Sequence, residues 1–168
     1  MSAHLRTILV ACAVASIPGI SLADSPHFVT GPTASIDSTT GDYTVSFKEA
    51  GLGTTPITYS LTAKTATFTF RCFTKSNNTP NGAPNGISIS NDSTASTVTP
   101  RHGQITSSIT LSPEKDGASC NGGGLRLCLV GADYTGVVFA DVTDGLSFDM
   151  PDLSAGNGST SQLECFSK

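Results

Sequence analysis

The sequence contains no tryptophan, and only three of its 168 residues are tyrosines. Exported β-domains that bind carbohydrate generally do so on exposed aromatic side chains, whose flat faces pack against sugar rings. Tyr43, Tyr59 and Tyr134 each alternate with apolar residues that we expect in the core. The sequence therefore lacks the aromatic platform that sugar stacking requires.

Clusters of basic residues and long apolar runs are also scarce. Nine lysines and arginines stand against thirteen acidic residues, which gives a formal net charge of −4. Binding to nucleic acid or to an anionic membrane depends on clustered Lys and Arg, so neither partner is predicted. After residue 23 no apolar run approaches the roughly 20 residues that a spanning helix needs, so no membrane span is predicted.

Recognisable catalytic motifs are absent. There is no Gly-x-Ser-x-Gly, and residues 112–115, Ser-Pro-Glu-Lys, match Ser-x-x-Lys without the Ser-Asp-Asn or Lys-Thr-Gly that penicillin-recognising enzymes also carry. A Ser-His-Asp triad would need His27 or His102, and His102 precedes Gly103 in an expected exposed turn. We therefore predict no catalytic residue.

Metal-binding patterns are weak as well. No Cys-x-x-Cys occurs, and the two histidines beyond residue 23 are far apart, which argues against zinc. The densest acidic segment contains four aspartates: Asp141, Asp144, Asp149 and Asp152. Its first five residues, Asp-Val-Thr-Asp-Gly, offer oxygen ligands for calcium, but they lack EF-hand spacing and are typical turn residues. We predict no metal and no cofactor.

The chain does begin with the pattern of a secretory signal. Arg6 is followed by an apolar run over residues 8–17 and then by Ser-Leu-Ala, which has small residues where signal peptidase reads. Residues 1–23 are therefore predicted to be a signal peptide, with a mature chain starting at Asp24. In the alternative, Leu-Val-Ala-Cys is a lipoprotein box that would leave an acylated Cys12, although the apolar run continues past it.

Four cysteines follow the predicted cleavage site: Cys72, Cys120, Cys128 and Cys165. An even number in an exported chain indicates two disulfide bonds, for which three pairings exist. A Cys72–Cys120 bond would restrict the unfolded chain by about 4 kcal/mol on the entropic model, against about 2.6 kcal/mol for Cys120–Cys128. The longer bridge is preferred, with Cys128 holding Cys165 and a Gly/Ser-rich C-terminal tail, and the other pairings remain open.

Residues 24–168 have the length of one domain, and their apolar residues recur at the period of a β-strand. The most strand-like stretch, 124–142, is interpreted as a pair of buried strands interrupted at Gly131. No window has the 3.6-residue period of a helix. About eight short strands separated by turn-rich segments predict an all-β fold, an antiparallel β-sandwich.

Two details refine this prediction. The apolar positions change from odd to even numbers between Leu61 and Phe68 with no turn residue, which predicts a β-bulge or a bend at residues 63–66. Three polar stretches are predicted to be long loops: 77–86, 91–102 and 113–124. Loops on a rigid sandwich are the usual place for binding residues.

Most of the chain after the signal resembles a known family. The segments that carry the resemblance are SPHFVTGPTASIDSTTGDYTVSFKEAGLG, YSLTAKTATFTFRC, HGQITSSITLSP and LCLVGADYTGVVFADVTDG, and VSFKEAGLG is the most specific. They are similar to a small family of secreted bacterial and fungal proteins of no established function. The resemblance implies a β-sandwich with a bridge equivalent to Cys72–Cys120, and it implies no activity. Cys128, Cys165 and the Asn-Gly-Gly-Gly after Cys120 depart from that family's pattern, so the second bridge is inferred from this sequence only.

The sequence favours a secreted or cell-surface, non-enzymatic domain that binds an extracellular protein or glycan through its long loops. The alternative is an extracellular hydrolase with a carboxylate-based site, whose candidates are Glu49, Asp133, Asp141 and Asp144. Glu49 lies within VSFKEAGLG, where a salt-linked strand end explains it as well as a functional carboxylate does. Three asparagines begin glycosylation sequons, which are relevant only in a eukaryotic host: Asn77, Asn91 and Asn157.

Overall fold

The computed structural model describes residues 25–115 and 117–166, so the predicted signal peptide, Cys12 and Asp24 lie outside the described residues. The regular structure within these ranges consists of β-strands in two antiparallel sheets. The strands are β1 (His27–Ile36), β2 (Tyr43–Ala50), β3 (Ile57–Thr74), β4 (Pro80–Val98), β5 (Gln104–Leu111), β6 (Leu125–Asp141), β7 (Leu146–Met150), β8 (Leu153–Gly156) and β9 (Cys165–Phe166). The prediction of an all-β antiparallel β-sandwich is confirmed.

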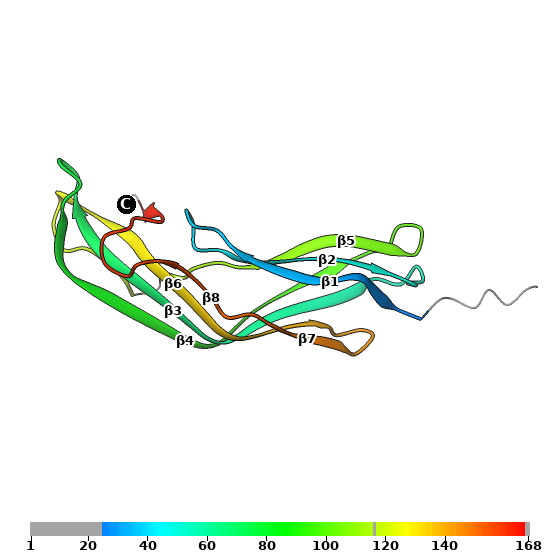
Figure 1. The fold of residues 1–168 in the computed structure, drawn as a ribbon. Coiled ribbons are helices and arrows are strands. Elements are labelled where there is room, and N and C mark those ends of the chain that lie inside the picture. The colour runs from blue at the N-terminus through cyan, green and yellow to red at the C-terminus, as the bar shows by residue number, and fades with distance from the viewer. Residues whose placement is uncertain (1–24, 116, 167–168) are drawn as a thin grey trace, which may run out of the picture.

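The two sheets differ in size. The smaller has the order β1-β2-β5, and the larger has the order β4-β3-β6-β7, with β8 and β9 also paired to β6. Figure 1 shows the smaller sheet over one half of the larger, while β3, β4 and β6 extend beyond it toward the C-terminal residues. The β3–β6 ladder therefore has one end under the smaller sheet, where Tyr59 pairs with Asp141, and one end outside it, where Thr74 pairs with Leu125.

The core follows from strand alternation. On β2, Tyr43, Val45 and Phe47 share the inward face and are buried. They join inward residues of the larger sheet in one cluster, in which the Phe47 ring lies 4.4 Å from the Tyr59 ring and 4.8 Å from the Phe139 ring. Aromatic side chains bury large apolar areas, so this cluster fixes the two sheets against each other.

The larger sheet bends where the parity change predicted it. Lys64 on β3 lies opposite Asn91 on β4 and Gly136 on β6. At this position the inward-facing residues of all three strands change between odd and even numbers. Asn91 and Gly136 have positive φ angles of 55° and 60°. A Cβ on Gly136 would lie 2.9 Å from the Lys64 Cβ, so the close approach of the strands requires glycine there. The predicted irregularity at residues 63–66 is confirmed as one that crosses three strands.

Two of the three predicted loops are wrong. Residues 77–86 and 91–102 contribute most of their length to β4, which runs without a break through Ile87 between them. β4 pairs with β3 along almost its whole length, so the backbone hydrogen bonds of this ladder override the Asn-Gly and Pro turn signals. Because β4 is an edge strand whose side chains are mostly exposed, prolines and glycines cost little there.

The stretch 124–142 also differs from its prediction, because it forms one strand and not two. β6 runs through Gly131, and its ladder with β3 shifts register between Thr69 and Phe70, which leaves Val130 as the extra residue of a β-bulge. The stretch is central to the larger sheet, since β3, β7, β8 and β9 all pair with it. The third predicted loop agrees with the structure, because residues 113–115 and 117–124 lie outside any strand.

The disulfide pairing is the preferred one. Cys72 bonds Cys120 and so ties the 113–124 loop to β3, and Cys128 bonds Cys165 and so ties β9 to β6. These bonds are consistent with an extracellular location. Among the residues described, there is no helix with the length and apolar character to cross a membrane.

Candidate functional site

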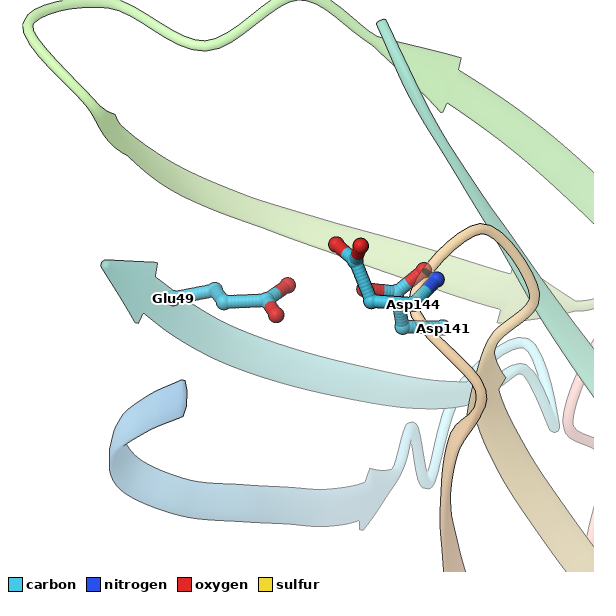
Figure 2. Close-up of side chains that lie close together, drawn as sticks. All are labelled: Glu49, Asp141 and Asp144. Carbon is cyan, nitrogen blue, oxygen red and sulfur yellow. Dashed lines mark hydrogen bonds between the residues drawn. The ribbon is translucent and has the colours of Figure 1, made fainter. Parts of the chain in front are cut away.

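Three carboxylates meet between the two sheets, at the end of the β3–β6 ladder that lies under the smaller sheet. Glu49 is near the end of β2, Asp141 is the last residue of β6, and Asp144 lies in the turn before β7. Each contributes one carboxylate oxygen to a group in which these atoms all lie within 4.8 Å of one another. Figure 2 shows Glu49 reaching from the smaller sheet toward the two aspartates of the larger one. Glu49 and Asp141 are 0% exposed, whereas Asp144 is exposed.

Strand alternation places Glu49 in this unusual position. It follows Tyr43, Val45 and Phe47 on the inward face of β2, so its carboxylate occupies the next core position. Asp141 pairs with Tyr59 across the β3–β6 ladder, which brings the Tyr59 side chain beside both acids. The site is therefore built by both sheets.

The hydrogen bonds of the site leave two buried oxygens unpaired. The Tyr59 hydroxyl donates to Glu49 Oε2 at 2.7 Å. Asp141 Oδ1 accepts from the backbone N–H of Thr143 at 2.8 Å and of Asp144 at 3.0 Å. Glu49 Oε1 and Asp141 Oδ2 are buried and have no hydrogen-bond partner among the described residues. A buried polar atom without a partner is costly, so these two oxygens call for a proton or a cation between them.

The protonation of Glu49 is shifted accordingly. Burial raises its pKa to about 7, the Tyr59 hydroxyl opposes this rise, and the charges of Asp141 and Asp144 add to it. Burial and the neighbouring Asp141 also raise the pKa of Asp144. Near neutral pH the cluster therefore gains or loses a proton readily, and at higher pH it concentrates negative charge.

With EDTA present to remove metal ions, the free energy of unfolding is expected to fall as the pH rises from about 4.5 to about 7. Glu49 has a pKa of about 7 when folded and 4.5 as its ordinary value, so in this window the folded chain holds a proton that the unfolded chain has released. A higher pH favours the state that has already released the proton, which in this window is the unfolded chain. Urea denaturation across this range measures the effect.

Glu49→Gln is the matched control for this pH profile, because an amide keeps the shape of the side chain and does not titrate. The difference between the two profiles isolates Glu49 from Asp92 and Asp144, whose pKa values burial also raises. A variant whose stability declined in parallel with wild type across the window would show that Glu49 does not titrate there.

A second candidate site lies at the opposite end of the β3–β6 ladder. Here the 113–124 loop, the start of β6 and β9 enclose a pocket of about 450 Å³. Its apolar lining includes Leu125, Leu127 and Phe166, and its basic lining consists of three of the nine lysines and arginines of the chain: Lys75, Lys115 and Arg126. No acidic residue is among the described lining residues, although the chain is acidic overall.

Local contacts hold the cations at this pocket. The Lys115 Nζ lies 4.9 Å from the centre of the Phe166 ring, a cation–π contact. Arg126 donates from Nη2 to Asn78 Oδ1 at 2.5 Å, while its buried Nε has no partner in the described part of the chain. The Cys72–Cys120 bond anchors the loop, since Cys120 itself lines the pocket. The pocket thus combines an apolar wall with positive charge.

The structure brings together some of the predicted site residues and separates others. Asp133 is exposed on β6, away from the three clustered carboxylates, and Asp149 is exposed on β7. Asp152 Oδ1 accepts a hydrogen bond from the Gly136 N–H at 2.8 Å, and so acts at the bend of the sheet. Tyr43, Tyr59 and Tyr134 are 0% exposed, as their alternation with expected core residues predicted.

The remaining motif residues show no catalytic arrangement. His27 and His102 are exposed, and His102 lies in a turn with a φ of 53°. Ser112 and Lys115 lie in a loop, so a helical turn does not bring the amine to the hydroxyl. The asparagines of the three sequons are exposed. Sequence reasoning missed Lys75 and Arg126, because basic residues this far apart in the chain give no local pattern.

Comparison with known proteins identifies no relative of this chain. No protein-family model, no curated protein and no solved structure matches the chain. The molecule is thus defined by its own structure as a two-disulfide antiparallel β-sandwich with a buried carboxylate cluster at one end and a cationic pocket at the other.

Proposed function

We propose that this protein is a secreted or cell-surface, non-enzymatic domain, and that the pocket beside the 113–124 loop receives an anionic segment of an extracellular protein. The observation that carries the proposal is the gathering of Lys75, Lys115 and Arg126 around one partly apolar hollow in an acidic chain. The predicted signal peptide, the family resemblance and the two disulfide bonds support the location.

The chemistry of the pocket favours a peptide over a sugar. Its volume is within the range of ligand sites, and its walls offer Leu125, Leu127 and Phe166 for apolar side chains. Arginine and lysine bind carboxylates through charge-assisted hydrogen bonds. Sugars need stacking surfaces and hydroxyl partners, and the three tyrosines are buried. An acidic residue flanked by apolar ones therefore matches the lining best.

The carboxylate-based hydrolase stays the second candidate, and the geometry supports it less well. Glu49 and Asp141 lie together, as a pair of catalytic acids would, and Glu49 has a pKa near neutrality. Both side chains are 0% exposed, however, and neither they nor Asp144 line the pocket. A substrate has no access to the pair in this conformation.

An array of hexapeptides tests the proposed binding. One set carries Asp or Glu between apolar residues, a matched set carries Asn or Gln instead, and acidic oligosaccharides are printed beside them. We expect binding to the acidic peptides only, and we expect the Lys75→Gln/Lys115→Gln variant to bind at least about tenfold more weakly. Each charged hydrogen bond is worth roughly 1.5–3 kcal/mol, and about 1.4 kcal/mol corresponds to tenfold in affinity.

Lys64→Gln is the control, because Lys64 is an exposed lysine at the bend of the sheet and away from the pocket. It removes the same charge and should leave peptide binding unchanged. Equal binding by the amide peptides, preferential binding of the oligosaccharides, or full affinity in the double variant would contradict the proposal.

A further inference from the structure

We propose that Glu49, Asp141 and Asp144 form a calcium site that links β2 of the smaller sheet to the β6–β7 turn of the larger one. The argument starts from the two unpaired oxygens, Glu49 Oε1 and Asp141 Oδ2, which are buried and belong to different sheets. Nothing among the described residues donates a hydrogen bond to either atom.

Three carboxylates at one site favour a bound cation over a single shared proton. One proton between Glu49 and Asp141 would pair two oxygens, but it would leave the carboxylate of Asp144 facing two acids that hold one negative charge between them. A divalent cation balances charge from all three groups at once. The groups that act on Glu49 are its burial, the Tyr59 hydroxyl, Asp141 and Asp144, and no lysine or arginine is among them. None of the groups that act on Glu49 in the described part of the chain supplies a compensating positive charge, which a bound cation would provide.

The dimensions and the donor type favour calcium. The carboxylate oxygens lie within 4.8 Å of one another, which is twice a Ca–O distance of about 2.4 Å. All donors are oxygens, because His27 and His102 are elsewhere and all four cysteines beyond residue 23 are in disulfide bonds. Zinc usually takes nitrogen or sulfur ligands, and magnesium demands a near-ideal octahedron.

The turn that follows β6 presents the third ligand. Asp141 Oδ1 accepts the N–H groups of Thr143 and Asp144, and the Gly145 N–H donates to the Asp141 carbonyl at 3.0 Å. These bonds use one oxygen of Asp141 and leave the other for the cation. Asp144 is exposed, so the site has an open side for entry and for water ligands, which calcium sites commonly include.

Thermal unfolding of the exported chain after EDTA treatment tests the site. Free calcium at 100 times its dissociation constant is expected to raise the unfolding midpoint by roughly 5–10 °C. Glu49→Gln should abolish this rise, because it removes the ligand charge while its amide can still donate to Asp141 Oδ2. Asp144→Asn should weaken calcium binding at least about tenfold in calorimetric titration.

Asp149→Asn is the matched control, since it removes an exposed aspartate on β7 outside the cluster and should leave the calcium response intact. Terbium provides a second readout, because Tyr59 is hydrogen-bonded to Glu49 and can sensitise terbium luminescence at the site. Calcium should displace this signal, and magnesium should do so far less well. A wild-type midpoint unmoved by millimolar calcium, or a rise that persists in both Glu49→Gln and Asp144→Asn, would overturn the proposal.

Discussion

Replacing Cys72 and Cys120 together by alanine is expected to lower the free energy of unfolding by about 4 kcal/mol. The bond joins residues 48 apart in sequence, and on the entropic model a loop of this length restricts the unfolded chain by that amount. Native domains have about 5–15 kcal/mol of stability in total, so this loss is a large fraction of it. Urea unfolding of the purified protein measures the loss.

The second bond gives this prediction its control. Cys128 and Cys165 are 37 residues apart, which corresponds to about 3.9 kcal/mol on the same model, so the two double variants should be almost equally destabilised. Both variants should also disturb the pocket, because the Cys72–Cys120 bond anchors the 113–124 loop and the Cys128–Cys165 bond holds β9, whose Phe166 lines the pocket. A loss of less than about 1 kcal/mol for either pair would mean that the entropic model does not describe this chain.

The strands that local alternation alone defines were predicted correctly. The alternation of Tyr43 with apolar core residues is the pattern of β2, because a strand with one buried face repeats every second residue. The change of the apolar positions from odd to even numbers between Leu61 and Phe68 predicted the bend, because a slip of one residue moves every later side chain to the other face. Both are properties of a single strand, so the sequence contains them.

Features that depend on a partner strand could not be predicted. The residues of β4 read as two loops because Pro, Asn and Gly have poor strand propensity, and only pairing with β3 makes them extended. Lys75 and Arg126 share a pocket because Thr74 pairs with Leu125, a contact that no spacing in the sequence reveals.

The carboxylate cluster lies between these two cases. One signal was present, because Glu49 has the same parity as three core residues of β2 and so reads as a carboxylate in a core position. Its partners were not readable, since the register of β3 against β6 brings Asp141 to it. The aspartates therefore read as ordinary turn residues, a role that Asp141 Oδ1 does in fact perform.

Phe139→Ala is expected to lower the free energy of unfolding by about 3–5 kcal/mol, which is the usual range for removing a buried aromatic ring. Phe139 is 0% exposed, and its ring centre lies 5.8 Å from that of Phe28, 4.8 Å from that of Phe47 and 5.9 Å from that of Tyr59. These partners come from both sheets, so the cavity would open in the interface itself. Urea unfolding with an unchanged slope would measure the loss within one two-state transition.

Val138→Ala is the comparison for this variant, because Val138 is the preceding residue on β6, faces the other side of the sheet and is 37% exposed. Its truncation should cost less than about 1 kcal/mol. The Phe139 ring also stacks on Tyr59, whose hydroxyl bonds Glu49, so the cavity should loosen the carboxylate cluster as well. Phe139→Ala should then bind terbium more weakly than Val138→Ala does. Equal stability of the two variants would show that the sheets are held together elsewhere, and that the aromatic cluster does not position the acids.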